Sequence, residues 1–351
     1  MSGTSRSSVA ADPAATLPSE CHPGNTTPSA RLRTGVTSPL LSRPGAVPAD
    51  PPDSGVAAHY GDPYAEQRAL AGGHALVDLS HRPVVRIAGP DRLTWLHSLL
   101  TQHLTDLQPG VWTEALVLSP QGHVEHDLRL VDDGEAVLAH LEPGTADALL
   151  DFLRKMQFML RVEVSDVSAD WAVVADPAPR LLPRVDLAVY DGPVAGVGAY
   201  EALRVERREP RLGLDTDHRT IPHEVGWLSS AVHLDKGCYR GQETVARVHN
   251  LGRPPRRLVL LHLDGSDSEL PTTGEAVQLD GRDVGRVGTA VRHHELGPIA
   301  LAVVKRQVPD DAALQAGAVA ASIDAEPASN LPASPARAAA SAREGLLRHR
   351  R

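Results

Sequence analysis

The pattern of apolar and polar residues divides the middle of the chain into two regions. From residue 59 to residue 253, short β-branched runs such as residues 84–87 are interleaved with stretches of helical spacing. Behind Gly89-Pro90-Asp91, whose proline and acid suit the first turn of a helix, four leucines recur at that spacing: Leu93, Leu96, Leu100 and Leu104. Strands and helices that do not strictly alternate predict an α+β fold.

A hairpin and a second helix are predicted within this first region. Residues 114–118 and 124–131 are strand candidates, and the turn between them, residues 119–122, contains a proline and a glycine. Thr145 can cap a helix with four residues on one apolar face: Leu149, Leu153, Met156 and Leu160. Further short strands are predicted at residues 162–165 and 171–175.

Beyond residue 253 the pattern changes to short strands separated by glycine turns. The candidates are residues 259–261, 276–279, 283–291, 299–305 and 319–323. Such a series is typical of a small all-β barrel or sandwich. We therefore predict a C-terminal β-barrel over residues 254–324.

The two ends of the chain differ from this folded middle. Residues 1–58 contain no Phe, Trp, Tyr or Ile but nine of the 29 prolines, a composition that buries too little apolar surface to offset its ordering entropy. Residues 325–351 are rich in alanine and end in a basic segment. We interpret the first as a disordered leader and the second as a disordered tail, with a short helix or a contact with an acidic partner as the alternative for the tail.

Charge and cysteine content narrow the function classes. The net charge of -9 argues against a direct nucleic-acid binder that works through bulk charge. Neither a membrane span nor a secretory signal is expected, because no apolar run is long enough. Cys21 and Cys238 are the only cysteines. Cys21 lies in the predicted leader, so a disulfide is not expected, and a cytoplasmic location is the natural interpretation. Two cysteines cannot by themselves supply the four ligands that usually hold an iron–sulfur cluster.

Residues 235–243 form the densest group of chemically informative residues. Gly237 and Gly241 permit unusual backbone conformations, and Gly241 can cap a helix over residues 242–250. Cys238 then lies just ahead of a helix N-terminus and beside Lys236, and both features favour a thiolate. The alternative is a small buried apolar residue in a tight loop.

This segment resembles a known family. The pattern Lys236-Gly237-Cys238-Tyr239-x-Gly241-Gln242-Glu243 is similar to the signature of the YgfZ-type folate-binding proteins, relatives of the glycine cleavage T-protein. Further likenesses lie in the Asp-x-Ser-His motif of residues 77–81, the Arg-x-Glu motif of residues 203–213, the Pro-x-Glu turn of residues 221–226 and the hairpin of residues 283–289. The resemblance spans about residues 59–324.

The resemblance implies a fold and a ligand. It implies a T-protein-like ring of two α+β lobes, residues 59–253, plus the C-terminal β-barrel around a central channel that holds tetrahydrofolate. The acid of the Pro-x-Glu turn binds the pterin in relatives, which makes Glu224 the first candidate, and one carboxylate can accept adjacent pterin N–H donors. Arg247 could meet the folate carboxylates and Tyr239 could stack on a ring. The alternatives are a solvated loop acid, an exposed helix arginine and a packed tyrosine.

The chain departs from the T-protein at its catalytic acid. The family carries an Asp-Asp pair after the hairpin turn, of which the first is catalytic, and here the first position is His126 and only Asp127 remains. Strand periodicity predicts that Val124 and His126 share one face and that Asp127 shares the other with Glu125. Asp127 is kept as a candidate folate contact. His126 could act as a base near neutral pH, or be a satisfied core residue. No metal site is expected from His123 with His126, since their side chains point to opposite faces.

Three functions follow from these observations. The first is a tetrahydrofolate-binding accessory factor for assembly or repair of 4Fe-4S proteins, with Cys238 as the reactive thiol and with iron–sulfur client or assembly proteins as partners; the family also implies a link to tRNA thiolation. The second is a folate-dependent aminomethyltransferase or demethylase, which His126 at the catalytic position opposes. The third is a non-catalytic folate sensor or scaffold.

Overall fold

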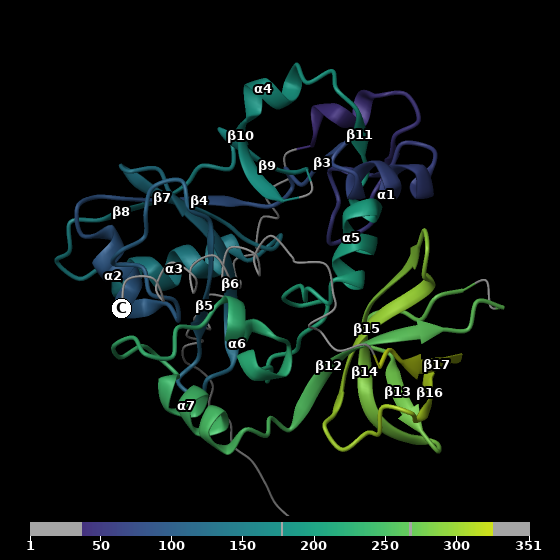
Figure 1. Ribbon diagram of the computed structural model, residues 1–351. Coiled ribbons are helices and arrows are strands. Elements are labelled where there is room, and N and C mark those ends of the chain that lie inside the picture. Colours follow the sequence, from purple (N-terminus) through teal and green to yellow (C-terminus); the bar gives the residue numbers. More distant parts are fainter. Residues whose placement is uncertain (1–36, 177, 267–268, 326–351) are drawn as a thin grey trace, which may run out of the picture. The chain divides into compact units, whose positions relative to one another are not determined.

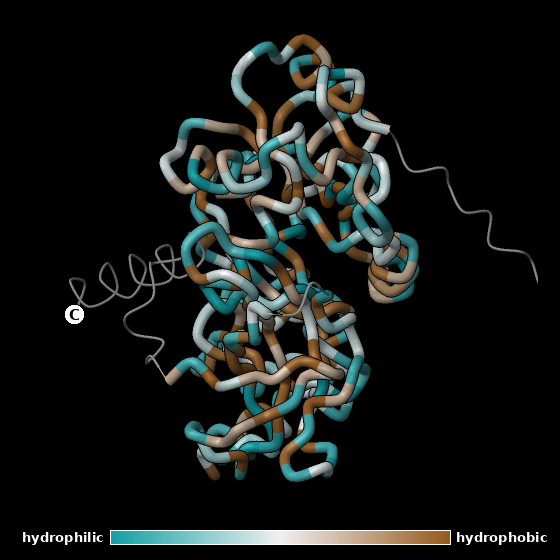
Figure 2. The backbone as a smooth tube through the Cα atoms, turned by 90° about the vertical axis from the view of Figure 1, so that its right-hand side faces the viewer, coloured by the Kyte–Doolittle hydropathy of each residue, from teal (hydrophilic) through white to brown (hydrophobic). Residues whose placement is uncertain are grey.

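The computed structural model describes residues 37–325, except residues 177 and 267–268. Figure 1 shows its helices and strands along the chain. Apolar and polar residues interleave along the backbone instead of separating into long blocks (Figure 2). No helix among the described residues is both long and apolar enough to cross a membrane. The predicted tail of residues 325–351 lies, apart from its first residue, outside the described residues.

The first sheet carries the predicted hairpin. Its five strands follow the order β5-β6-β7-β4-β8, with bounds β4 (Val84–Ala88), β5 (Thr113–Leu118), β6 (Val124–Asp132), β7 (Ala136–His140) and β8 (Glu163–Asp166). The helices α2 (Arg92–Leu99) and α3 (Ala146–Met156) supply Trp95, Leu96, Leu149 and Leu153 to one buried core with the apolar face of this sheet. The amphipathic spacing seen in the sequence therefore produces a helix-on-sheet layer.

Both helices end earlier than their leucine spacing predicts. Helix α2 ends at Leu99 because the side chain of Lys236, far along the chain, donates hydrogen bonds to the carbonyls of His97 and Leu100. Helix α3 ends at Met156, and Met156 and Leu160 are exposed instead of joining Leu149 and Leu153 in the core. A cation at the final carbonyls of a helix is a common stop signal, but here tertiary structure supplies it.

The second sheet is smaller and gathers strands from distant parts of the chain. Its order is β10-β9-β3-β11, with bounds β3 (Leu76–Asp78), β9 (Trp171–Ala175), β10 (Pro179–Pro183) and β11 (Val194–Ala195). The accompanying helices are α1 (Pro63–Ala71), α4 (Arg184–Ala188) and α5 (Val197–Glu206). Leu70 of α1 and Tyr200 and Leu203 of α5 share one core with Val77 and Val173 of the sheet.

The C-terminal region is the predicted barrel. Six strands close in the order β12-β15-β14-β13-β16-β17, with bounds β12 (Arg256–Leu263), β13 (Ala276–Leu279), β14 (Arg282–His293), β15 (Gly297–Lys305), β16 (Ala313–Ala316) and β17 (Val319–Ile323). Inward apolar residues such as Leu261, Val287 and Ala302 fill it. Between α5 and the barrel lie η2 (Pro222–Glu224), α6 (Trp227–Ser230) and α7 (Gln242–Leu251). The α+β class and the closed barrel are confirmed.

The predicted leader of residues 1–58 differs from the structure in its last third. Residues 1–36 lie outside the described residues, but η1 (Pro39–Ser42), β1 (Val47–Pro48) and β2 (Ala57–His59) belong to the fold. Leu40 and Val56 are buried, and Ser38 donates a hydrogen bond to Asp78. The prediction of disorder fails here because polar and ionic contacts fix this segment, and a count of apolar residues does not register such contacts.

Candidate functional site

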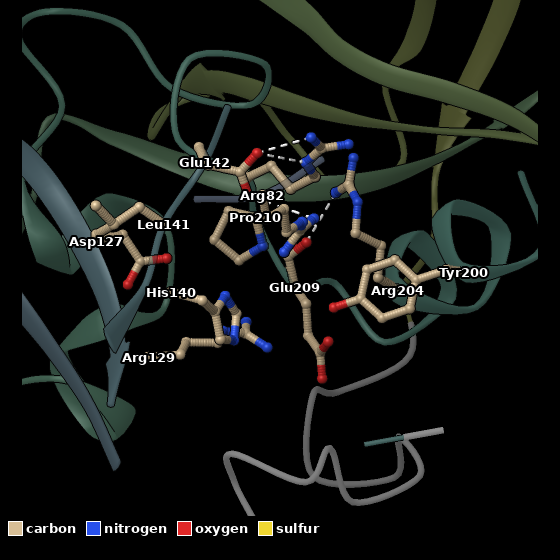
Figure 3. A pocket seen from close by; sticks show the side chains of 11 residues that line it. Arg82, Asp127, Arg129, His140, Leu141, Glu142, Tyr200, Arg204, Glu209 and Pro210 are labelled. Carbon is tan, nitrogen blue, oxygen red and sulfur yellow. Dashed lines mark hydrogen bonds and ion pairs between the residues drawn. The ribbon is translucent and has the colours of Figure 1, made fainter. Parts of the chain in front are cut away.

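A charged cavity lies between the first sheet and helix α5. Its volume is about 330 Å³, including the open mouth, and the side chains around it leave room for about one water molecule. Strand β6, the end of β7, helix α5 and the segment after it all contribute to its walls. We call this cavity the pocket; it is lined by Arg82, Asp127, Arg129, His140, Leu141, Glu142, Tyr200, Arg204, Glu209, Pro210 and Arg211 (Figure 3).

A β-bulge near the start of β6 changes which of its residues share a face. Val117 of β5 pairs with His126, but its neighbour Leu118 pairs with Val124, so Glu125 is an extra residue on β6. A bulge of this kind re-aims the flanking side chains. Val124 therefore packs with Leu118 in one core, while His126, opposite Val117, lies on the other face. The prediction that Val124 and His126 share a face is wrong for this reason.

Asp127 is the residue that faces the pocket. It pairs with Leu116 across the sheet and is buried, and its Oδ1 atom has no hydrogen-bond partner. Burial, together with the negative charge of Glu114, raises the pKa of Asp127 well above its ordinary value, although Arg129 opposes this. The protonated form of this carboxyl group, which can both donate and accept a hydrogen bond, is therefore favoured more than it would be in water.

His126, by contrast, is a core histidine. It is 7% exposed, and burial lowers its pKa to about 4. It does not line the pocket. A base with so low a pKa is neutral at physiological pH, and one that points away from the cavity cannot reach a ligand inside it.

The strand register places a row of polar residues beside Asp127. Glu114, Arg129 and His140 are direct neighbours across β5, β6 and β7. Burial, with the positive charges of Arg82 and Arg129, lowers the pKa of His140 well below its ordinary value, so the imidazole is neutral. Its Nε2 atom is buried without a partner. The pocket thus contains two unpaired polar atoms on adjacent strands.

The rear of the pocket is a network of ion pairs that reaches back to the N-terminal segment. Arg211 binds the carboxylates of Asp53, Glu142 and Glu201 at 2.7–3.0 Å. Although burial opposes ionisation, hydrogen bonds from His81 and Arg211 hold the pKa of Asp53 below its ordinary value. Arg204 binds Glu201 and Asp215 and reaches Thr289 of the barrel. These contacts connect the predicted leader, both lobes and the barrel through buried charges.

The predicted folate acid Glu224 lies outside the pocket lining. It is 3% exposed, and its two carboxylate oxygens each accept a hydrogen bond from Arg256 at 2.8 Å. One of them also accepts the N–H of Ile221 at 3.1 Å. Arg256 in turn binds Asp217, and these bonds hold the pKa of Asp217 below its ordinary value. A pterin edge could bind this carboxylate only by displacing Arg256.

The predicted signature residues are of two kinds: buried residues that hold the loop in place, which we call anchors, and exposed residues. Lys236 is buried and donates to the carbonyls of His97, Leu100 and Gln102, so its charge is used within the protein and does not serve a thiolate. Burial lowers its pKa to about 8. Tyr239 is 7% exposed and packs with Leu116 and Leu118. Gln242 donates to the Lys236 carbonyl at 3.4 Å.

Two glycines let the signature loop approach the β5–β6 turn. Gly241 caps α7 with φ of 83°, and a Cβ atom there would lie 2.7 Å from the carbonyl oxygen of Ser119. Gly122 has φ of 82°, and its Cβ would lie 2.7 Å from that of Thr244. Both positions therefore require glycine, for conformation and for space. Arg240 strengthens this contact by binding Glu125, the bulged residue, at 3.1 Å.

The remaining signature residues face solvent. Gly237, Cys238 and Glu243 are exposed, as is Arg247 on α7. Cys238 is a free cysteine. A Cβ at Gly237 would meet no atom within 4 Å. Between the anchors Lys236 and Tyr239, the chain therefore presents Gly237 and Cys238 at the surface. Among residues 37–325, apart from the three left undescribed, no cluster of His, Cys, Asp and Glu has the arrangement of a metal site.

Sequence reasoning missed most of the pocket. Arg82, Arg129, His140, Tyr200 and Glu209 were not predicted as site residues, because they come from separate elements and form no motif. One signal was present: Arg129 lies between two leucines of β6, and His140 follows four apolar residues of β7. Such residues are rarely buried unless they are paired or functional.

Comparisons with known proteins agree with this fold. Residues 59–179 match the model of the GCVT N-terminal domain. A chloroplastic protein of Arabidopsis thaliana that is named as a transferase is 23% identical over 62% of this chain and 62% of its own length, so the chain spans less than two thirds of this relative. An aminomethyltransferase of Geobacillus kaustophilus is 28% identical over 69% of this chain and 82% of its own length.

A solved structure shows the same fold. The glycine cleavage system aminomethyltransferase T of Bartonella henselae superposes with a TM-score of 0.68, covering 84% of this chain and 98% of its own, at 17% sequence identity. The chain therefore has the fold of the glycine cleavage T-proteins. Beyond the fold, the chain is similar to the GCVT N-terminal domain over residues 59–179 and to aminomethyltransferases at 23–28% identity.

Proposed function

We propose that the chain binds tetrahydrofolate in the pocket, and that Asp127 is the principal polar contact. Two observations support the proposal. The fold and relatives are those of folate-dependent aminomethyltransferases. Within that fold, Asp127 is a buried carboxyl group with an unsatisfied oxygen, and buried polar atoms are left unpaired chiefly where a ligand or water completes them.

The chemistry of the pocket fits a pterin. A pterin offers adjacent ring N–H and amino donors, which the free oxygen of Asp127 can accept, and it offers a carbonyl oxygen for an arginine. Because the pocket has room for about one water molecule between its side chains, we expect side chains to move when the ring binds. Glu224 remains the second candidate, reached only if Arg256 releases it.

Calorimetry with 5-formyltetrahydrofolate tests the proposal. We expect Asp127→Asn to weaken binding about ten-fold or more, since an amide cannot accept two donors as a carboxylate does. Glu224→Gln changes a carboxylate outside the pocket and serves as the matched variant. If Glu224→Gln loses folate binding and Asp127→Asn keeps it, the folate site lies at the Pro-x-Glu turn and not in the pocket. No binding by the unaltered chain contradicts folate binding altogether.

We further propose that the folate-bound protein is a YgfZ-type accessory factor for assembly or repair of 4Fe-4S proteins, with a link to tRNA thiolation. The Lys236–Glu243 signature supports the type, and the exposed free thiol of Cys238 supports a partner-facing role. The test is the activity of 4Fe-4S enzymes under oxidative stress in a strain carrying Cys238→Ala. Full activity there, with folate binding intact, contradicts the thiol role and favours a folate sensor or scaffold.

One observation favours one-carbon transfer as the second candidate function. The sequence argument against it was that His126 occupies the catalytic position, but Asp127, not residue 126, faces the pocket. The acid that lines the pocket supports this second candidate. Glycine-cleavage activity with purified partner proteins decides this point. Turnover that survives His126→Ala and is abolished in Asp127→Asn establishes the second function.

A further inference from the structure

The pocket contains four arginines, and two of them have no donors left. Arg204 uses all five of its N–H groups on Glu201, Asp215, Thr289 and the Glu209 carbonyl. Arg211 uses all five on Asp53, Glu142 and Glu201. A guanidinium group has five donors in a fixed arrangement. These two residues are therefore structural and cannot bind a ligand without breaking the network.

Arg82, unlike Arg204 and Arg211, has N–H donors that are not used. It is 3% exposed, and its Nε and Nη2 atoms make no hydrogen bond. Its ion pair with Glu142 is long at 3.4 Å, and Arg211 already binds the other oxygen of that carboxylate. The guanidinium lies over the ring of Tyr200, 5.5 Å from the centroid, which holds it in place without using its donors. Arg82 therefore presents unused donors at the wall of the pocket.

Asp127 is the complementary unpaired group. It lies on the side of the pocket away from Tyr200 and Arg204, and no hydrogen bond or ion pair reaches it in Figure 3. The charge of Arg82 acts on Asp127, yet no hydrogen bond joins the two side chains. The other charged groups around Asp127 are Glu114, Arg129 and Glu142, and the neutral His140 lines the same cavity. The pocket thus holds a cation with unused N–H donors and an acid with an unpaired oxygen, and the two groups do not satisfy each other.

A ligand that satisfies both must carry an acceptor and a donor. We propose that the pocket binds a small zwitterion, an amino-acid-like molecule whose carboxylate accepts hydrogen bonds from Arg82 and whose ammonium group donates to Asp127. This inference builds on the proposed folate site, because it makes the zwitterion a second ligand of the same pocket. A planar carboxylate matches the arginine fork. An anion or a cation alone would leave one of the two buried groups unpaired, which costs free energy.

The test uses a series of small probes on the full chain. Glycine, β-alanine and γ-aminobutyrate vary the separation of the two charges, while acetate and methylamine each carry one of them. We expect at least one zwitterion to bind in calorimetry. Acetate and methylamine should each bind with an affinity lower than that zwitterion's by a factor of about ten or more. Arg82→Gln and Asp127→Asn should each weaken that zwitterion about ten-fold or more. Arg180→Gln, which removes an arginine paired only with Asp176 at the surface, should change nothing.

The outcomes separate this inference from the folate proposal. Arg82→Lys, which keeps the charge, covers the case in which Arg82→Gln does not fold. The inference is overturned if no zwitterion binds, if acetate binds as tightly as the best zwitterion, or if Asp127→Asn binds it unchanged. Parallel titration with 5-formyltetrahydrofolate distinguishes the two failures. Zwitterion binding without folate binding overturns only the folate proposal, and folate binding without zwitterion binding overturns only this inference.

Discussion

The signature loop and the pocket differ in how their polar groups are used. In the loop, Lys236 donates to three backbone carbonyls and Tyr239 is packed in a core, whereas Cys238 and Glu243 are exposed. In the pocket, Arg82, Asp127 and His140 keep polar atoms unpaired although they are buried. The segment with the strongest motif is therefore mainly structural, and the site without a motif holds the unsatisfied chemistry.

This difference has a physical cause. A motif of adjacent residues marks a tight local structure, and here Gly241 and Gly122 show that the structure is the contact between a loop and a hairpin. A ligand site needs groups that converge from several elements, and these have no fixed spacing in sequence. Four predictions test this contrast, in order of expected effect.

Removal of the N-terminal segment should have the largest effect. A chain that begins at residue 36 retains Asp53, whereas one that begins at residue 55 lacks this carboxylate, one of three that bind Arg211, and also lacks the buried Leu40. Loss of one partner from a buried ion pair costs about 3–5 kcal/mol. Denaturant unfolding of the two chains measures the difference. Equal stability would show that the ion network does not depend on this segment.

Lys236→Met should destabilise the protein by about 3 kcal/mol, because three carbonyls lose their donor and each unmade bond costs about 1 kcal/mol. The folded pKa of Lys236, about 8, lies below its ordinary value of 10.5, so the unfolded chain binds more protons between these values. The stability of the unaltered protein relative to Lys236→Met should therefore rise from pH 8 to pH 10.5. Unfolding free energies across this range check both effects, and Lys305→Met at the surface is the control.

Asp127→Asn should stabilise the protein by about 1–2 kcal/mol at pH 7, because it removes a buried group whose charged form has no partner. The raised pKa of Asp127 means that the folded state binds more protons than the unfolded state above pH 3.8. The stability of the unaltered protein relative to Asp127→Asn should therefore fall as pH rises from 4. A loss of stability in Asp127→Asn would show that the carboxylate has a structural partner. If Asp127→Asn is more stable but binds folate more weakly, the acid is kept for binding at a cost in stability.

Cys238→Ser should have the smallest effect on stability, within about 0.5 kcal/mol, because the side chain is exposed. Thermal unfolding measures this change, and reaction with a thiol reagent should label the unaltered chain at Cys238 without unfolding it. A larger loss would indicate that the thiol is buried in solution, in agreement with the alternative interpretation of a small apolar loop residue.

The sequence predicted the elements far better than the site. The hairpin of residues 114–131, the helix behind Gly241 and the barrel follow from apolar periodicity and glycine position, which are local properties. The lengths of α2 and α3 and the place of residues 37–58 were not predictable in this way. Lys236 ends α2 from a distance, and Asp53 is held by an arginine 158 residues away. Contacts between residues so far apart in the chain produce no periodic pattern of apolar and polar residues.

The sequence by itself determined the α+β class, the C-terminal barrel and the family resemblance, because regular spacing and a dense motif can be recognised without coordinates. Only the tertiary structure decided which acid faces the pocket. One extra residue, Glu125, places Val124 and His126 on opposite faces of β6, and it is Asp127 that lines the cavity. Strict alternation along a strand cannot reveal a bulge, since the bulge depends on pairing with a second strand. The tertiary structure also decided which charged groups use all their hydrogen bonds and which, such as Arg82 and Asp127, keep buried polar atoms without a partner.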